Sequence, residues 1–291
     1  MKRYSILLCL FIGLSTFAQS INQEMDGKKP YLIGKINKDG LTTAPYQSWF
    51  EKNYNSVQPD AKLVEQLKPL LPEYTIKAFL GTWCGDSRRE VPRLYQVLDL
   101  AEFPLQRLTT VALDKHADHY RQSPGGEQEA MNVFRVPTII LFKDGKEVNR
   151  IVERPKVSIE ADLLTMMQGE YVPNYQGVTD IMGLMADLGP VKFERRLQRT
   201  ARNYKEEVEH YYGFSTLAKV WYADNKKDEA VAVTRLSCMM FPEEKGPKLL
   251  LASYLEAVNL AQEARILYNE VLGLEAENST AKNGLKRLAT K

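Results

Sequence analysis

A single cysteine, Cys84, stands where a short β-prone run passes into the pattern of an amphipathic helix. The run Tyr74–Leu80 favours a buried strand, and from Gly85 onward apolar residues recur at helical spacing until the chain approaches Pro104. A cysteine at the start of a helix faces unpaired backbone amides and the positive end of the helix dipole, which stabilise a thiolate. This junction therefore predicts a strand followed by a helix that presents a nucleophilic sulfur.

Strand and helix patterns alternate around this junction. The order indicates a mixed sheet with a hairpin at one edge and helices on both faces. Besides the strand and helix that flank Cys84, the predicted elements are a helix over 61–71, strands over 108–113, 136–142 and 148–152, and helices over 127–134 and 158–167. The preceding residues, 21–58, form a polar lead-in with one short predicted strand at Tyr31–Ile36.

The second half of the chain is helical and contains a repeat. Asp-Glu-Ala at 228–230 aligns with Gln-Glu-Ala at 262–264, and Ala218 aligns with Ala252, in both cases 34 residues later. This is the period of tetratricopeptide repeats, which stack helical hairpins against one another. We therefore predict four segments: a signal peptide over 1–20, the lead-in over 21–58, an α/β domain over 59–172 and a tetratricopeptide-like domain over 173–291.

The first twenty residues have the layout of a secretory signal peptide. Two basic residues precede an apolar run over 6–14, and small and polar residues follow up to Ser20. The apolar run is shorter than the roughly 20 residues of a membrane-spanning helix, which favours cleavage over anchoring. We therefore expect a periplasmic or secreted protein with no membrane span after signal removal.

Removal of that segment leaves two cysteines, Cys84 and Cys238. Two cysteines do not make a disulfide framework, although the exported location allows them to pair. The alternative is that Cys238 is a small buried apolar residue on a helix.

Three segments, taken in order, resemble the thioredoxin superfamily and in particular exported bacterial thioredoxin-like proteins. They are Trp83-Cys84-Gly85, Pro92 within the following helix, and Val136-Pro137-Thr138 before a strand. The resemblance covers roughly 59–168 and implies a thioredoxin-like fold. It also implies a cis Pro137 beside the sulfur and a backbone at Val136 that binds extended peptides. The residues implied to line the substrate surface are Trp83, Gly85, Asp86, Val136, Pro137 and Thr138.

Two departures from that family limit the chemistry. The position of the second cysteine is Ser87, and the position of the usual buried acid is Ala78. A dithiol cycle within this domain is excluded, because a hydroxyl cannot form a disulfide. One hypothesis is a monothiol cycle on protein or peptide thiols and disulfides, with Cys84 and Ser87 as candidate catalytic residues. The other is a redox-inactive fold kept for binding, in which the helical repeats hold a protein partner.

Other ligand classes have little support in the sequence. The net charge is +2, from 39 basic and 37 acidic residues that are well mixed, so nucleic acid is not an expected partner. Asp114, His116, Asp118 and His119 have metal-ligand chemistry but occupy one polar loop, so we predict no metal site. No cofactor motif is found. The aromatic residues near Trp221 fit either a repeat core or a peptide-binding surface.

Overall fold

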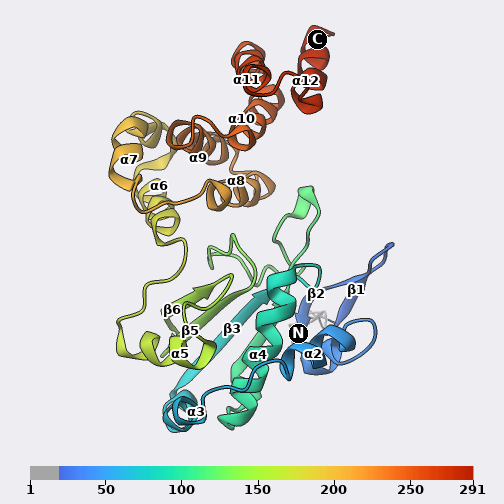
Figure 1. Ribbon diagram of the computed structural model, residues 1–291, viewed down its shortest axis with the longest axis vertical. Coiled ribbons are helices and arrows are strands. Elements are labelled where there is room, and N and C mark those ends of the chain that lie inside the picture. The colour runs from blue at the N-terminus through green and yellow to red at the C-terminus, as the bar shows by residue number, and fades with distance from the viewer. Residues whose placement is uncertain (1–19, 291) are drawn as a thin grey trace, which may run out of the picture.

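The computed structural model describes residues 20–290, which form an α/β half followed by an all-helical half (Figure 1). A mixed sheet with helices is followed by helices alone from Gln176 onward, which fits the predicted thioredoxin-like fold with a helical domain after it. The predicted signal peptide lies outside the described residues. Between residues 20 and 290, no helix combines the length and hydropathy needed to cross a membrane.

Six strands form one sheet in the order β1-β2-β4-β3-β5-β6. β3 and β4 run parallel, and every other neighbouring pair is antiparallel. Asp144 and Gly145 both adopt positive φ angles and close the predicted hairpin between β5 and β6. The strands are Gln23–Met25 (β1), Tyr31–Ile36 (β2), Tyr74–Leu80 (β3), Leu108–Ala112 (β4), Thr138–Lys143 (β5) and Lys146–Val152 (β6).

Side chains of the central strand β3 alternate between the two faces of the sheet. Ala78 and Leu80 pack in the clusters under the helices, whereas Phe79 packs on the opposite side. The helices of the first half supply side chains to the clusters of the first face only, and Figure 1 shows them in front of the sheet. They are Lys38–Leu41 (α1), Gln47–Tyr54 (α2), Ala61–Leu67 (α3), Gly85–Leu100 (α4) and Ile159–Gln168 (α5).

An irregular segment, residues 113–137, covers the other face, where the sequence predicts a helix over 127–134. Its residues Val133 and Val136 pack in the cluster on that face. Gly126, Ala130 and Asn132 adopt positive φ angles, which an α-helix does not allow, so the segment forms turns instead. We refer to residues 113–137 as the β4–β5 segment. The expected arrangement of helices on both faces is therefore replaced by helices on one face and this segment on the other.

Residues 21–58, which the sequence presents as a lead-in, are built into the α/β half. β2 occupies the predicted residues and pairs with β4, and β1 pairs with β2 at the edge of the sheet. Phe50 of α2 is buried, and its ring lies 5.8 Å from that of Tyr95 on α4. The segment thus supplies two strands and part of the core.

The second half begins at a linker around Pro173 and contains helices that pack as hairpins. α9 and α11 begin and end 34 residues apart, which is the period found in the sequence. Ala218, Ala230, Ala252 and Ala264 are fully buried, and small side chains at these positions allow the paired helices to approach closely. The helices are Gln176–Glu194 (α6), Leu197–Tyr204 (α7), Tyr212–Ala223 (α8), Lys227–Met240 (α9), Lys245–Ala257 (α10), Ala261–Leu274 (α11) and Ser279–Ala289 (α12).

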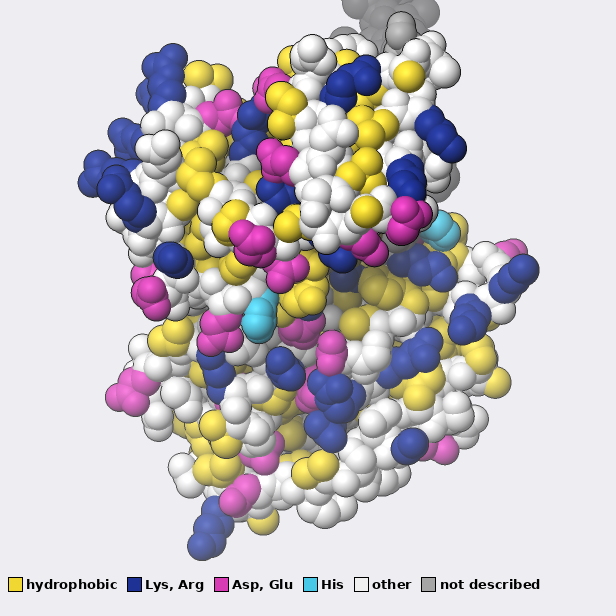
Figure 2. Space-filling view, turned by 45° about the horizontal axis from the view of Figure 1, so that its top comes forward, with side chains coloured by type: hydrophobic (Ala, Val, Ile, Leu, Met, Phe, Trp, Pro, Cys, Tyr) yellow, Lys and Arg dark blue, Asp and Glu magenta, His cyan; other side chains and the backbone are white. Residues whose placement is uncertain are grey.

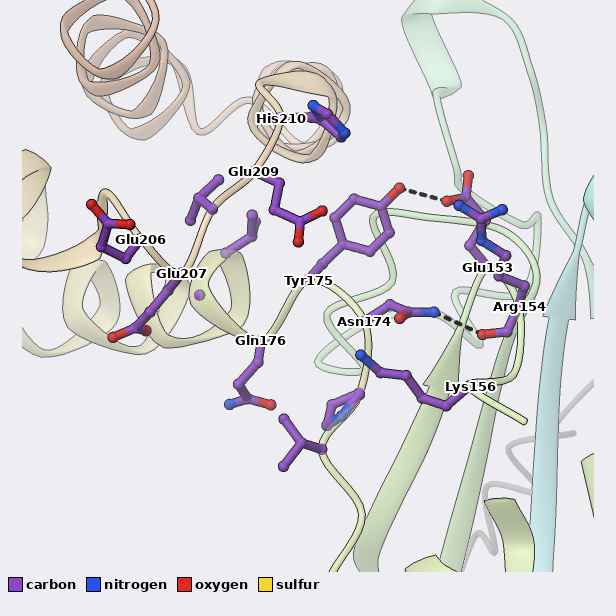
Figure 3. Close-up of a pocket in the computed structure, with 15 residues that line it drawn as sticks. Glu153, Arg154, Lys156, Asn174, Tyr175, Gln176, Glu206, Glu207, Glu209 and His210 are labelled. Carbon is purple, nitrogen blue, oxygen red and sulfur yellow. Dashed lines mark hydrogen bonds between the residues drawn. The ribbon is translucent and has the colours of Figure 1, made fainter. Parts of the chain in front are cut away.

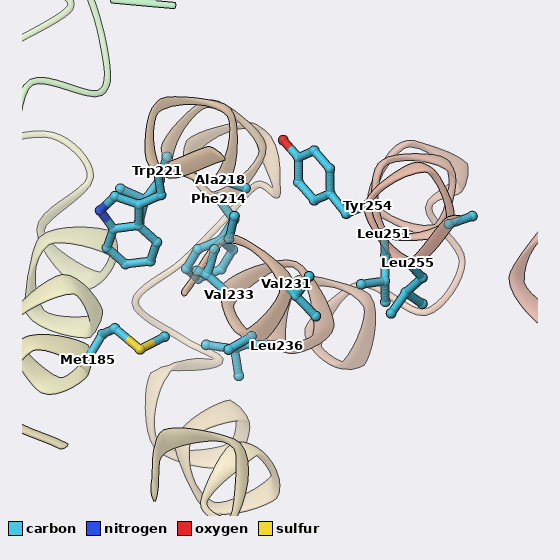
Figure 4. Close-up of a cluster of buried hydrophobic side chains, with 14 of the residues drawn as sticks. Met185, Phe214, Ala218, Trp221, Val231, Val233, Leu236, Leu251, Tyr254 and Leu255 are labelled. Atoms are coloured by element: carbon cyan, nitrogen blue, oxygen red, sulfur yellow. The ribbon is translucent and has the colours of Figure 1, made fainter. Parts of the chain in front are cut away.

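The helical half has its own hydrophobic core (Figure 4). Trp221 and Phe214 of α8 pack in one cluster with Leu236 of α9 and Met185 of α6. Only 8% of Trp221 is exposed, so this ring belongs to the core and not to an open groove.

The two halves meet mainly along the β4–β5 segment. Phe134 from this segment is buried and packs in the core of the helical half. Gln122 donates a hydrogen bond of 2.8 Å to Asp224 after α8, and Lys219 lies 6.0 Å from the ring centre of Tyr120. In Figure 2, hydrophobic side chains and charges of both signs lie along the junction. The β4–β5 segment therefore packs against the sheet on one side and against α8 on the other.

Candidate functional site

The turn between β3 and α4 positions the cysteine that the sequence singles out. Cys84 is the N-cap residue of α4, with extended backbone angles, and its carbonyl accepts the first helical hydrogen bond from Arg88 at 3.0 Å. A side chain at Gly81 would lie 2.5 Å from the Trp83 ring, so only glycine allows this ring to close over the turn. The turn therefore presents the sulfur at the amide-rich end of the helix.

The sulfur of Cys84 lies against a segment that is distant in sequence. Cys84 is partly exposed, and its Sγ donates a hydrogen bond of 3.3 Å to the carbonyl of Val136. The Val136–Pro137 peptide bond is cis. Thr138 follows at the start of β5, and its hydroxyl donates to the carbonyl of Arg135 at 2.8 Å. Of the residues implied by the resemblance, Val136 thus contacts the sulfur, and the buried Pro137 and Thr138 follow it along the chain.

Ser87 has a different role from the one expected of a catalytic residue. Its side chain is fully buried, and its Oγ accepts a hydrogen bond of 3.1 Å from the amide of Gly81. The serine therefore fastens the first turn of α4 to the end of β3, while the sulfur of Cys84 bonds to Val136.

The remaining predicted site residues surround the sulfur or lie along the helix. Trp83 is half-buried, and its indole Nε1 donates to the carbonyl of Leu113 at 3.0 Å. Gly85 is exposed at the first helical position. Asp86 points along the helix and pairs with Arg89 at 2.6 Å. Trp83 is thus partly exposed and Gly85 exposed next to the cysteine, whereas the carboxylate of Asp86 is paired with Arg89.

Arg121, on the β4–β5 segment, belongs to the site but carries no motif that the sequence could reveal. It is 6% exposed and adopts a positive φ of 64°. Its guanidinium carbon lies 4.5 Å from the centre of the Trp83 ring and 4.8 Å from that of Tyr120. Its Nε and Nη1 are buried and have no hydrogen-bond partner among residues 20–290. A cation therefore lies within cation–π distance of two aromatic rings, one of which belongs to the residue before the cysteine.

The electrostatics of Arg121 follow from its burial. Burial lowers the pKa of the Arg121 guanidinium, and the neighbouring cation Arg135 lowers it further. Interactions with Tyr120 and Cys84 raise the pKa but do not cancel the effect of burial. Arg135 itself is ion-paired with Glu153. Arg121, by contrast, makes no hydrogen bond from its buried Nε or Nη1 to any residue between 20 and 290.

The second cysteine, Cys238 on α9, is separate from this site. Both Cys84 and Cys238 are free thiols. Burial raises the pKa of Cys238 to about 12, so its thiol stays protonated near neutral pH. The pairing left open by the sequence is not present, and Cys238 is half-buried against the helical core.

The polar loop that contains metal-ligand residue types forms a hydrogen-bond network. Asp114 is buried and accepts hydrogen bonds from the Tyr31 hydroxyl at 2.7 Å and the His116 amide at 2.9 Å. Burial works against ionisation of Asp114, but these hydrogen bonds prevail and lower its pKa. Asp118 and His119 are exposed. No group of three or more His, Cys, Asp or Glu side chains in the described chain is placed to hold a metal ion.

A cavity of about 540 Å³ lies at the junction of the two halves, beside the linker that precedes α6 (Figure 3). Four glutamates and three basic side chains line it, and Tyr175 of the linker donates a hydrogen bond to Glu153 there. Burial and this carboxylate raise the pKa of Tyr175 to about 12. Cys84 is not among the lining residues, so the cavity is distinct from the cysteine site.

The α/β half is similar to thioredoxins. The chain is 29% identical over 102 residues to a thioredoxin of Alicyclobacillus acidocaldarius, covering 35% of this chain and 84% of that protein. It is 39% and 34% identical over 74 residues to thioredoxins of Chlamydia muridarum and Chlamydia pneumoniae. These matches cover 25% of this chain and 63% of the chlamydial proteins. Together with the sheet topology, they support a thioredoxin-like domain.

Two further comparisons add nothing to this result. No protein-family model matches the chain. A solved structure of a protein of unknown function from Pseudomonas aeruginosa is 13% identical, with a TM-score of 0.31, and covers 44% of this chain and 75% of its own. That likeness carries no argument.

Proposed function

We propose that this protein performs monothiol thiol–disulfide exchange through Cys84. The observation that carries the proposal is the position of the sulfur, which is partly exposed at the N-cap of α4 and lies against the Val136 carbonyl. A thiolate at this position is stabilised by the free amides of the first helical turn. The similarity of the α/β half to thioredoxins supports a thioredoxin-like redox function.

The proposed cycle has two exchange steps. The Cys84 thiolate attacks one sulfur of a substrate disulfide, a Cys84–substrate disulfide forms, and the other substrate sulfur leaves as a thiolate. Ser87 cannot attack this adduct, so a second thiol must do so. Attack by another cysteine of the same substrate gives isomerisation. Attack by an external thiol regenerates Cys84, and a further external thiol completes a two-electron reduction.

Protein or peptide disulfides are the proposed substrates. The carbonyl of Val136, before the cis Pro137, lies beside the sulfur, and the exposed Gly85 leaves the approach from solvent open. We further propose a periplasmic or secreted location, supported by the signal-peptide pattern of residues 1–20. The helical half, whose hairpins have the tetratricopeptide period, is proposed to hold a protein partner.

The competing function is a redox-inactive binding protein. Ser87 replaces the second cysteine, and Ala78, at the position of the family's usual acid, is buried in an apolar cluster. Both features remove parts of the usual thioredoxin cycle. In this alternative, Cys84 is catalytically inactive and the fold is retained for binding a partner.

A turnover assay separates the two functions. Protein lacking residues 1–20 is mixed with a glutathionylated peptide and excess reduced glutathione, and release of the peptide thiol is followed. We expect wild-type protein to accelerate release above the rate with glutathione alone, and Cys84→Ser to remove the acceleration. Cys238→Ser is the matched control and should retain it, because that thiol is buried. A wild-type rate equal to that of glutathione alone would contradict the exchange function and leave the binding function as the remaining candidate.

A further inference from the structure

Arg121 differs from the other strongly buried guanidinium of the α/β half. Arg150 is 9% exposed and is bound by both oxygens of Glu147, at 2.6 Å each, and by the carbonyl of Met131. Arg121 is buried to a similar degree but has no carboxylate partner among the described residues, and two of its nitrogens are unbonded. Buried charges in proteins are ordinarily paired, so this one indicates a partner that the chain does not supply.

The surroundings of Arg121 place that partner next to the reacting sulfur. Its guanidinium stacks on Trp83, the residue before Cys84. Trp83 and Cys84 both pack against the apolar cluster on the face of the sheet that the β4–β5 segment covers. The Tyr120 ring centre lies 4.8 Å from the guanidinium carbon. An anion held by Arg121 would therefore lie close to a molecule joined to Cys84.

A small cavity at the junction of the two halves borders Arg121. Its volume is about 80 Å³, which accommodates a carboxylate group with its water but not a peptide segment. Asp224, one of its two acids, accepts a hydrogen bond from Gln122, and Nε and Nη1 of Arg121 have no hydrogen-bond partner in the described chain. Val133 lines the cavity and packs in the same cluster as Cys84. The polar lining residues are Arg121, Gln128, Glu129, Asn132, Asp224 and Lys226.

We propose that the buried guanidinium of Arg121, which borders this cavity, is an oxyanion subsite beside the Cys84 site. The thiol or disulfide that exchanges with Cys84 carries a carboxylate near its sulfur, and the planar guanidinium binds that carboxylate through its free N–H groups. Exchange itself proceeds as above: the Cys84–S bond to the substrate forms, the substrate disulfide breaks, and the leaving sulfur departs as a thiolate. This inference rests on the proposed exchange function and names its substrate class.

Two chromogenic disulfides of similar size test the subsite. Dithiobis(nitrobenzoate) carries a carboxylate on each ring, whereas dithiodipyridine is neutral. Rate constants for Cys84 are measured in protein lacking residues 1–20, in the Cys238→Ser background. We expect Arg121→Gln to lower the ratio of the anionic to the neutral rate about tenfold, as for loss of a charge-assisted hydrogen-bonded pair. Arg199→Gln, an exposed position on α7, removes the same charge and should leave the ratio unchanged.

The outcomes separate the subsite from the exchange function. Equal slowing of both probes in Arg121→Gln would mean that Arg121 acts on Cys84 itself and would overturn the subsite, as would an unchanged ratio. A wild-type protein that fails to react with the neutral probe would refute the exchange function independently of charge. If Arg121→Gln does not fold, benzoate in the wild-type reaction provides the test: it should slow the anionic probe only, and equal rates with and without benzoate would overturn the proposal.

Two natural sources of the carboxylate are distinguished by a further comparison. Oxidised glutathione represents a small-molecule disulfide. Two disulfide-linked peptides, one with Glu and one with Gln beside the cysteine, represent a polypeptide substrate. Dependence of the glutathione rate on Arg121 identifies a small substrate, and a preference for the Glu peptide that is lost in Arg121→Gln identifies an acidic peptide. Independence of Arg121 in both comparisons would overturn the subsite.

Discussion

Ser87 lies one helical turn after Cys84, and its hydroxyl bonds to the amide of Gly81. This position gives the serine a structural use that does not involve the sulfur. It also explains why a hydroxyl is tolerated in a fully buried place, since a buried polar group requires a hydrogen-bond partner. Two substitutions of Ser87 can therefore separate the effect of the missing thiol from the effect of the hydrogen bond to Gly81.

Ser87→Cys should create a second thiol within reach of Cys84 and with it a dithiol cycle. We expect the variant to form an internal disulfide and to reduce insulin in the presence of a dithiol donor, whereas wild-type protein does so at or near the background rate. Ser87→Ala is the control, because it also loses the hydrogen bond to Gly81, at a cost of about 1 kcal/mol, but adds no thiol. A folded Ser87→Cys variant without insulin reductase activity would argue against exchange at this surface.

The two cysteines should differ strongly in reactivity. Burial raises the pKa of Cys238 to about 12, so its thiolate is scarce near neutral pH, whereas Cys84 is partly exposed at a helix start. Iodoacetamide should therefore label the native protein lacking residues 1–20 once, at Cys84, as read by peptide mass mapping. The label at Cys238 should appear only on unfolding. Labelling of both cysteines at similar rates in the native state would contradict this.

The sequence predicts the site residues that belong to recognisable motifs. It does not predict Arg121, which only the fold places next to Trp83. Cys84 and Trp83 stand in a recognisable motif, and Val136 was implied by resemblance. Arg121 has no such signal, because its importance depends on a positive φ angle and on the path of an irregular segment. Ser87 was assigned to chemistry, since the sequence does not show that its hydroxyl faces the amide of Gly81.

At the scale of elements, the turn between β3 and α4 is built around close packing at one glycine. A methyl group on Gly81 would lie 2.5 Å from the Trp83 ring, whereas a methyl group on Gly85 would meet nothing within 4 Å. The two glycines flank the same turn, but Gly81 is buried and its amide donates to Ser87, whereas Gly85 is exposed. They form a matched pair for testing whether Trp83 must close over the turn.

Gly81→Ala should destabilise the protein and disturb the site, whereas Gly85→Ala should not. Overpacking typically costs about 1–3 kcal/mol, and displacement of Trp83 would also free Arg121 from its stacking partner. At the exposed first turn of α4, alanine should be neutral or slightly stabilising. Chemical denaturation and the rate of Cys84 with dithiodipyridine measure the two effects. Equal stability of both variants would show that the turn adapts without cost.

Most elements of the α/β half follow from sequence pattern, and the β4–β5 segment does not. The strand at Tyr31–Ile36 and the hairpin at Asp144 are set by local composition. The predicted helix over 127–134 fails because positive φ angles at Ala130 and Asn132 form turns there. Tertiary contacts with both the sheet and α8 determine this conformation, and a local pattern contains no information about them.

At the scale of the whole molecule, the two halves have separate hydrophobic cores joined by a polar and aromatic junction. The sheet core contains Ile139, which is fully buried, and the helical core contains Trp221. The contacts that cross the junction include Phe134 in the helical core and the hydrogen bond from Gln122 to Asp224. Whether the halves unfold together depends on how these contacts compare with the stability of each core.

Trp221→Ala and Ile139→Ala in the full chain should destabilise different halves. Each change removes a large buried side chain, at a cost of about 3 kcal/mol or more for Trp221 and about 2–5 kcal/mol for Ile139. Because helical hairpins bury their apolar faces mainly against one another, we expect two calorimetric transitions. Trp221→Ala should lower the temperature of the transition that accounts for most of the helical circular dichroism, and Ile139→Ala should lower that of the other transition.

Asp224→Asn, which retains an acceptor for Gln122, is the control for the junction and should leave both transitions in place. A single transition that shifts equally in both core variants would mean that Phe134 and its neighbours make one cooperative core, and the separate partner-binding role of the helical half would lose its structural basis.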